Sequence, residues 1–176
     1  MPGMTRGHHA GTIKATKLDS ARRQLETAIT LWFNDSDPVS IHTLTAASYE
    51  ILRDLNKKAR GSPMGRDSDS IKPEFSGQWR KLHSDAENFF KHADKDPHDT
   101  FNLAPQSTDI MLLDAVAKYE ELSQEKHHLM SMFTLYMALK LLMIFVSSFI
   151  DEMRQSIPVN EVAPLSRKEF YKRFIR

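Results

Sequence analysis

The polar residues best suited to chemistry lie within residues 83–99, late in a helix predicted over 74–94. At roughly 100° per residue, Asp85, Asn88 and His92 fall on one side of that helix. Asn88 and His92 are four residues apart, so the amide can hydrogen-bond the imidazole and fix its tautomer. Such a pair could support acid–base chemistry, although an exposed helix face of this polarity also occurs without any function.

Metal binding is a first alternative for this stretch, because histidines and carboxylates offer nitrogen and oxygen donors to a divalent ion. The candidate ligands are His42, His83, His92, His98, Asp85, Glu87, Asp94 and Asp96. Helical bundles usually build metal sites from Glu and Glu–His pairs on several helices, and no matching pairs occur here. The absence of cysteine also excludes disulfides, thiolate zinc sites and iron–sulfur clusters. We therefore expect no metal and no cofactor.

The sequence Glu87-Asn88-Phe89-Phe90-Lys91-His92 resembles the signature of the HEPN superfamily, which has an Arg, a polar residue that is often Asn, three variable residues and a His. Asn88 and His92 match that pattern, whereas Glu87 stands where the family has Arg. The resemblance implies an all-helical fold. In active members it also implies a metal-independent RNase whose site forms where two subunits pair, often within toxin–antitoxin or other defence systems.

The replacement of that Arg by Glu87 bears directly on catalysis. Phosphodiester cleavage by the neighbouring 2′-hydroxyl needs an acid or base near the ribose and a cation for the charge that develops on the phosphate. His92 could be the acid or base and Asn88 could orient it, but the cation would have to come from Arg80 or Lys91. We therefore favour a non-catalytic HEPN-like binding or interaction module. A toxin-like RNase that uses His92 is the alternative, so whether the chain is an enzyme stays open.

The elements that must position these residues are predicted to be helices throughout. Few glycines and valines, no two-residue hairpin signal, and apolar residues at three- and four-residue steps favour an all-α antiparallel bundle. Asp37 before Pro38, and Ser166 three residues before Glu169, are typical helix starts. Five main helices and one short helix are predicted at 17–34, 38–59, 74–94, 108–126, 127–154 and 166–175. We expect a disordered leader over 1–15 and a helical bundle over 16–156 that contains an exposed loop at 61–73. A basic tail over 157–176 follows the bundle.

Residues 129–150 form a run of 22 mostly apolar residues, which is long enough to cross a bilayer. Lys140 lies near its middle, where a charge opposes insertion, and several hydroxyl side chains dilute it further. We therefore expect a central core helix, or a helix that buries an extra face in a dimer, and favour no membrane span. A membrane-associated helical protein is the second functional alternative.

The C-terminal segment combines basic side chains with aromatic ones. Basic residues meet phosphates and aromatic rings stack on bases, so this segment could bind RNA or another anion. The four cations assigned to that site are Arg167, Lys168, Lys172 and Arg173. An acidic membrane surface is another possible partner. The structural alternative is a terminal helix that docks Phe170 and Phe174 on the bundle and leaves its cations in water.

The balance of charge gives no direction to the choice of partner. The 24 Lys and Arg nearly equal the 23 Asp and Glu, so no whole-chain field would attract nucleic acid or a membrane. No glycine-rich phosphate loop, GxGxxG, GxSxG or HExxH motif is present. The N-terminal residues lack the apolar stretch of a signal peptide, so we expect a cytoplasmic protein. The expected partner is a second copy in a homodimer, and after that another protein or RNA.

Overall fold

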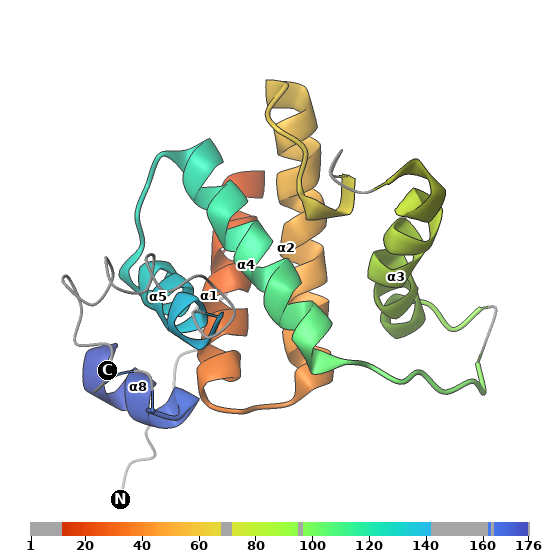
Figure 1. Cartoon of the computed structure of the whole chain (residues 1–176). Helices are drawn as coiled ribbons and strands as arrows, with labels where there is room; N and C mark the ends of the chain where they lie inside the picture. Colours follow the sequence, from red (N-terminus) through yellow and green to blue (C-terminus); the bar gives the residue numbers. More distant parts are fainter. Residues whose placement is uncertain (1–11, 68–71, 95–96, 142–161, 163, 176) are drawn as a thin grey trace, which may run out of the picture.

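The computed structural model describes residues 12–67, 72–94, 97–141, 162 and 164–175. Regular structure in this part of the chain is entirely helical, which confirms the predicted all-α bundle (Figure 1). The elements are α1 (Lys17–Phe33), α2 (Pro38–Ala59), the short 3-10 helix η1 (Gly65–Asp67), α3 (Pro73–Lys91), α4 (Pro105–Ser123), α5 (His128–Leu141) and α8 (Arg167–Phe174). Most of the predicted leader, residues 1–11, lies outside the described residues.

Local capping chemistry starts three of the helices. Reciprocal capping boxes begin α1 and α8, and the second is the predicted pair of Ser166 and Glu169. Before α2, Asp37 accepts a hydrogen bond from the Ser40 N–H at 2.8 Å, and Pro38 follows at the first helical position. Each cap satisfies an N–H that has no partner within its own helix. The predicted starts of α2 and α8 are therefore confirmed.

The two helices that flank the polar stretch differ from the prediction at their facing ends. α3 ends at Lys91 rather than at residue 94, and α4 begins at Pro105 rather than at 108. Proline suits the first turn because its missing N–H would have no helical partner there. Thr108, the predicted first residue of this helix, is buried within α4, and its hydroxyl lies 2.9 Å from His42 Nδ1. The connection between the helices, residues 92–104, is therefore displaced three residues toward the N-terminus.

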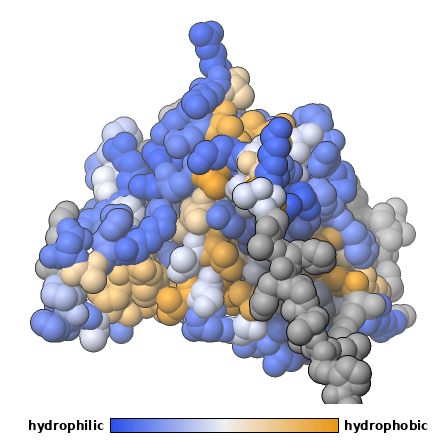
Figure 2. Space-filling model, turned by 180° about the vertical axis from the view of Figure 1, so that it is seen from behind, coloured by the Kyte–Doolittle hydropathy of each residue, from blue (hydrophilic) through white to orange (hydrophobic). Residues whose placement is uncertain are grey.

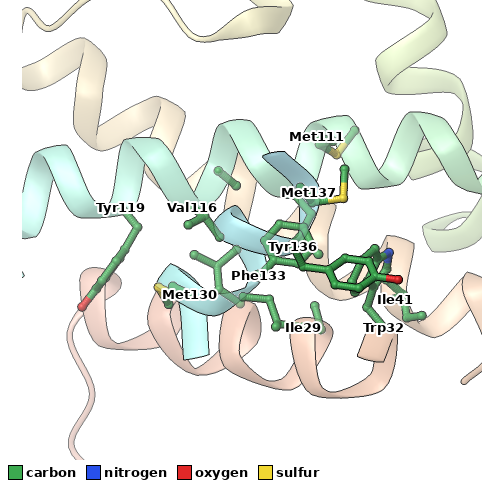
Figure 3. Packing of buried hydrophobic residues seen from close by; sticks show 14 of the residues in the cluster. Ile29, Trp32, Ile41, Met111, Val116, Tyr119, Met130, Phe133, Tyr136 and Met137 are labelled. Atoms are coloured by element: carbon green, nitrogen blue, oxygen red, sulfur yellow. The ribbon is translucent and has the colours of Figure 1, made fainter. Parts of the chain in front are cut away.

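The main core lies between α1, α2, α4 and α5, and α1 contributes its largest side chains. Trp32 and Phe33 are almost fully buried, and Phe133 of α5 meets Trp32 edge-on at a centroid distance of 4.9 Å. Figure 3 shows Met130, Phe133 and Tyr136 of α5 between α1 and α4. Removal of this apolar surface from water is the main favourable term in folding.

The described part of the apolar run ends at Leu141 and packs in this core as predicted. Met130, Phe133, Met137 and Leu139 are all buried. Residues 142–154, over which the prediction continues the helix, lie outside the described residues. Among the helices that the structure describes, none is both long and apolar enough to cross a bilayer.

The segment after α2, predicted as an exposed loop, packs on the bundle over residues 61–67. Met64 is 2% exposed and joins the main core. The Asp114 carboxylate on α4 accepts hydrogen bonds from the Tyr49 hydroxyl at 2.8 Å and from the Gly65 N–H at 2.7 Å. Backbone groups that leave water need such partners. This part of the loop is therefore a structural element, and residues 68–71 lie outside the described part.

α3 lies at one side of the molecule, where it contacts α2 and η1 (Figure 1). Ala86 is buried, but Phe75 on the first turn of this helix is 54% exposed. Figure 2 shows apolar surface open to solvent on the side of the molecule where α3 lies. α3 therefore packs beside the main core rather than within it.

α8 docks on the other side of the bundle through its aromatic residues, as the structural alternative predicted. Phe170 is buried and stacks on Phe33 with a centroid distance of 5.8 Å and an interplanar angle of 7°. Phe170 also meets the Tyr136 ring edge-on at a centroid distance of 5.0 Å, and Phe174 packs against Phe170 at 4.9 Å. α3 and α8 consequently occupy opposite sides of α1, α2 and α4 (Figure 1).

Candidate functional site

A pocket of about 640 Å³ lies where α3 meets the connection 92–104. Its volume is in the range of small-ligand sites. The lining combines three carboxylates, an amide, an imidazole, a hydroxyl and two phenyl rings, from Asp85, Asn88, Phe89, His92, Asp94, Asp99, Thr100 and Phe101. The polar stretch recognised in the sequence therefore forms a pocket together with the residues that follow it.

Asn88 and His92 both line this pocket, although they are not on one regular helix. The His92 N–H donates to the Asn88 carbonyl at 3.0 Å, which is the last hydrogen bond of α3. His92 itself has extended backbone, with φ −133° and ψ 135°. Both side chains are exposed, so a ligand in the pocket can reach the amide and the imidazole. Both residues therefore line one pocket, with Asn88 on the last turn of α3 and His92 just beyond its end.

Aromatic contacts hold the connection against α3. Phe101 packs against Phe89 at a centroid distance of 5.4 Å and against Phe90 at 5.8 Å. Phe90 in turn meets the His42 ring of α2 edge-on at 5.8 Å. Edge-to-face pairs of this kind contribute beyond their buried area. The apolar wall of the pocket is therefore attached to the core through His42.

The charge of the pocket is negative. Asp85, Asp94 and Asp99 contribute carboxylates, and no Lys or Arg is among the described residues of the lining. Among the residues that the structure describes, no three His, Asp or Glu side chains lie close enough to hold a metal ion. The carboxylates are instead distributed around the pocket. Such a site attracts an organic cation whose charge is spread over several atoms, and it repels a phosphate.

Glu87, at the position where the HEPN signature has Arg, makes ion pairs outside the pocket. Its carboxylate lies 2.5 Å from Lys91 Nζ and 3.8 Å from Arg66 Nη1, and its side chain is only 13% exposed. Arg66 belongs to η1, so Glu87 links α3 to the packed loop. The role of this carboxylate is therefore to position α3.

The two cations that the sequence offered for phosphate binding do not line the pocket. Lys91 is paired with Glu87 at 2.5 Å. Arg80 Nε donates to the Ser76 carbonyl at 3.2 Å on its own helix. Arg80 precedes Asn88 by eight residues, which is about 12 Å along the helix axis. Of the four residues predicted for catalysis, the structure thus brings together His92 and Asn88 only.

The basic residues of α8 divide into two pairs. Arg167 lies over the Trp32 ring at 4.0 Å and 3.4 Å from Asp109, and Lys168 lies 3.5 Å from Asp35. Lys172 and Arg173 are exposed on the following turn. The first pair contributes to the docking of α8, and Arg173 lies over the Phe174 ring at 5.3 Å. Anion binding by these four residues stays a prediction.

Two pocket residues, Thr100 and Phe101, were missed by reasoning from sequence. Phe101 follows the polar stretch in a connection with no helical period, so nothing in its spacing marks it as part of a site. A weak signal was present, because a lone large aromatic residue lies between Pro97 and Pro105. Such a residue in an irregular segment often anchors that segment to a neighbour.

The fold and the pocket define an all-α helical bundle with an acidic, aromatic-walled site at one side. No family model matches this chain, and searches among curated proteins and solved structures find no significant match. The resemblance to the HEPN superfamily is therefore still a prediction from six residues. Function has to be argued from the chemistry of the site, because one fold can serve many functions.

Proposed function

We propose that this chain is a non-catalytic, HEPN-like binding module that uses the pocket beside α3 to bind a cationic group of a protein partner. The favoured partner is a second copy in a homodimer, and the favoured location is the cytoplasm. The single observation that carries the proposal is the lining of the pocket, with three carboxylates and no Lys or Arg among its described residues.

The physical argument concerns the sign of the charge. A phosphate entering this pocket would approach Asp85, Asp94 and Asp99, whereas a guanidinium or ammonium would gain charge-assisted hydrogen bonds from them. Cations are also attracted to the faces of phenyl rings, and Phe89 and Phe101 lie beside the carboxylates. Both features favour a cationic ligand.

A metal-independent RNase is the second candidate, because Asn88 and His92 share the pocket and are exposed. Its test is incubation of the protein with structured and single-stranded RNA in EDTA. We expect no cleavage, because no Lys or Arg among the described residues of the lining can stabilise charge on the phosphate. Cleavage that His92→Ala abolishes and His98→Ala leaves intact would establish the enzyme instead. His98 is a matched control, since it is exposed and does not line the pocket.

Binding is tested by NMR titration of the isotope-labelled protein with a short oligoarginine peptide, an oligoglutamate peptide and single-stranded RNA. We expect the arginine peptide alone to shift the amide signals of Asn88 and Phe101. Asp99→Asn should raise the dissociation constant of the peptide several-fold, because one partly exposed charge contact contributes about 1 kcal/mol to the binding free energy. Asp54→Asn is the control, because Asp54 is exposed on α2 away from the pocket. Shifts at these amides with RNA and none with the arginine peptide would contradict the proposal.

A further inference from the structure

The chain is nearly neutral, but its charge is strongly divided between two sites. Residues 83–99 contain five acidic and two basic side chains, whereas residues 166–176 contain five basic and one acidic. The first segment supplies most of the residues that line the acidic pocket, and the second contains α8. Figure 1 places α3 and α8 on opposite sides of α1, α2 and α4. The two charged sites therefore do not neutralise each other within one copy.

The cations of α8 are presented on a rigid support. Phe170 is buried against Phe33 and Tyr136, and the capping box of Ser166 and Glu169 fixes the first turn. Because the helix backbone is already ordered, a partner that binds its exposed face does not have to order it. The exposed face includes Lys172 and Arg173 on the last turn.

We propose that the occupant of the acidic pocket is α8 of a second copy, with Lys172 and Arg173 facing Asp94 and Asp99. This inference rests on the proposed function and names the partner. The argument is charge complementarity between two exposed sites of one chain, which favours encounter and fixes orientation. In a two-fold symmetric dimer, α8 of each copy meets the pocket of the other, so the contact is made twice. A closed dimer of this kind is isologous, the most common symmetry of soluble oligomers.

The chemistry of the contact matches the pocket. The ammonium of Lys172 and the guanidinium of Arg173 are donors, and the pocket offers carboxylate oxygens together with the Asn88 amide as acceptors. An aromatic wall beside the carboxylates suits a guanidinium in particular. Because both partners are exposed before they meet, the contact should weaken strongly with salt.

The test is sedimentation velocity of the full chain over a range of concentrations, at about 50 mM and about 500 mM NaCl. We expect a monomer–dimer equilibrium that shifts toward monomer at the higher salt. The double variant Lys172→Glu/Arg173→Glu, and separately Asp94→Lys/Asp99→Lys, should each raise the dissociation constant by at least about tenfold. Circular dichroism checks that each variant is folded.

A mixture of the two double variants gives the sharpest result. Each alone places like charges at both contacts, but one copy of each restores opposite charges at both, so the mixed dimer should form. The matched control is Asp54→Lys/Lys58→Glu on α2, which reverses two exposed charges outside both sites and should leave the dimer unchanged. A chain that is monomeric throughout, a dimer that ignores both reversals, or a mixture that stays monomeric would each overturn the inference.

Failure of this inference can be distinguished from failure of the proposed function. If the chain is monomeric while the arginine peptide still shifts the pocket amides, only the identity of the partner is wrong. If the peptide also fails to bind, the proposed function is wrong as well. RNA that binds wild type and is released by Lys172→Glu/Arg173→Glu, with no self-association, would overturn the inference and assign α8 the predicted RNA-binding role.

Discussion

The connection before α3 and the connection after it are both rich in polar residues, but they use those residues in opposite ways. In the first, residues 61–67, polar groups bond to the bundle: Asn56 Nδ2 and Lys118 Nζ both donate to the Ser62 carbonyl, at 2.8 and 3.0 Å. Lys118 is only 4% exposed. In the second, residues 92–104, the polar side chains line a pocket that opens to solvent.

Two aspartates make the contrast concrete. Asp114 accepts hydrogen bonds from Tyr49 and from the Gly65 backbone, so its carboxylate is committed to the fold. Asp99 is exposed and lines the pocket, so its carboxylate can meet a ligand. The same residue type thus fastens the first connection to α4 in one case and lies open to solvent in the second connection in the other. Substitutions in the first connection should therefore change stability, and substitutions in the second should change binding.

The largest effect should come from Asp114→Ala. It removes the carboxylate that accepts from the Tyr49 hydroxyl and the Gly65 N–H, and loss of the acceptor of a buried group such as this hydroxyl costs about 1–3 kcal/mol. We expect the free energy of unfolding, measured by urea denaturation, to fall by about 2–4 kcal/mol. Asp99→Ala is the matched change in the second connection and should stay within about 0.5 kcal/mol of wild type. Equal losses in the two variants would remove the distinction between the connections.

The next effect should come from Gly61→Ala at the start of the first connection. A Cβ at residue 61 would lie 2.0 Å from Asn56 Oδ1, which cannot persist, so the Asn56 side chain must move. That movement disrupts the hydrogen bond from Asn56 Nδ2 to Ser62. We expect a loss of about 1–3 kcal/mol in the same denaturation measurement. A variant as stable as wild type would show that the loop adapts and that its packed conformation does not depend on the Asn56–Ser62 hydrogen bond.

Local chemistry explains which parts of the fold could be predicted. The Asp37 and Ser166 caps depend on residues within a few positions, and the amphipathic spacing of α1 and α2 depends only on the helical period. The ends of α3 and α4 are held by contacts of Phe101 with Phe89 and of Thr108 with His42, which the helical period does not reveal. The buried position of Met64 depends on contacts with α2 and α4 in the same way, so the loop looked exposed.

The candidate site was predictable to the same extent. Helical geometry placed Asn88 near His92, and the structure puts both in one pocket. It could not show that His92 has extended backbone, or that Phe101 returns to Phe89. Nor could it show that Arg167 would lie over Trp32, because these two residues are far apart in the sequence. Pairings between distant residues are set by tertiary packing, which spacing along the chain does not encode.

A third prediction concerns His42, the point where the second connection reaches the core. This side chain is 2% exposed, and its Nε2 has no hydrogen-bond partner in the described part of the chain. Burial lowers the pKa of His42, and this outweighs the opposing attraction of Glu87, while His83 and Lys91 lower it further. The histidine pKa of the unfolded chain is about 6.5. Between that pH and the lower pKa of the folded chain, the imidazole is therefore protonated in the unfolded chain and neutral in the folded chain.

The sign of the pH dependence follows from this difference. Stability from the neutral imidazole is complete above about pH 6.5, and the free energy of unfolding should fall as the pH drops below it toward the folded pKa. For one proton, the slope is at most about 1.4 kcal/mol per pH unit. Urea denaturation at several pH values should show this slope in wild type and a flatter one in His42→Gln. The slope should persist in His98→Gln, because His98 is exposed; its loss there would assign the effect to the surface.

The smallest predicted effect, Gly77→Ala on α3, is also the one with the opposite sign. A Cβ at residue 77 would meet nothing within 4 Å, and the residue lies inside a helix. Alanine reduces the conformational freedom of the unfolded chain and favours the helix, so thermal or urea denaturation should show a gain of up to about 1 kcal/mol. The gain should appear without any change in the affinity of the pocket for the arginine peptide, since Gly77 is not in its lining. If the affinity for the peptide rises together with helix stability, the order of α3 itself limits binding. The helix that joins the two connections would then contribute to both stability and binding.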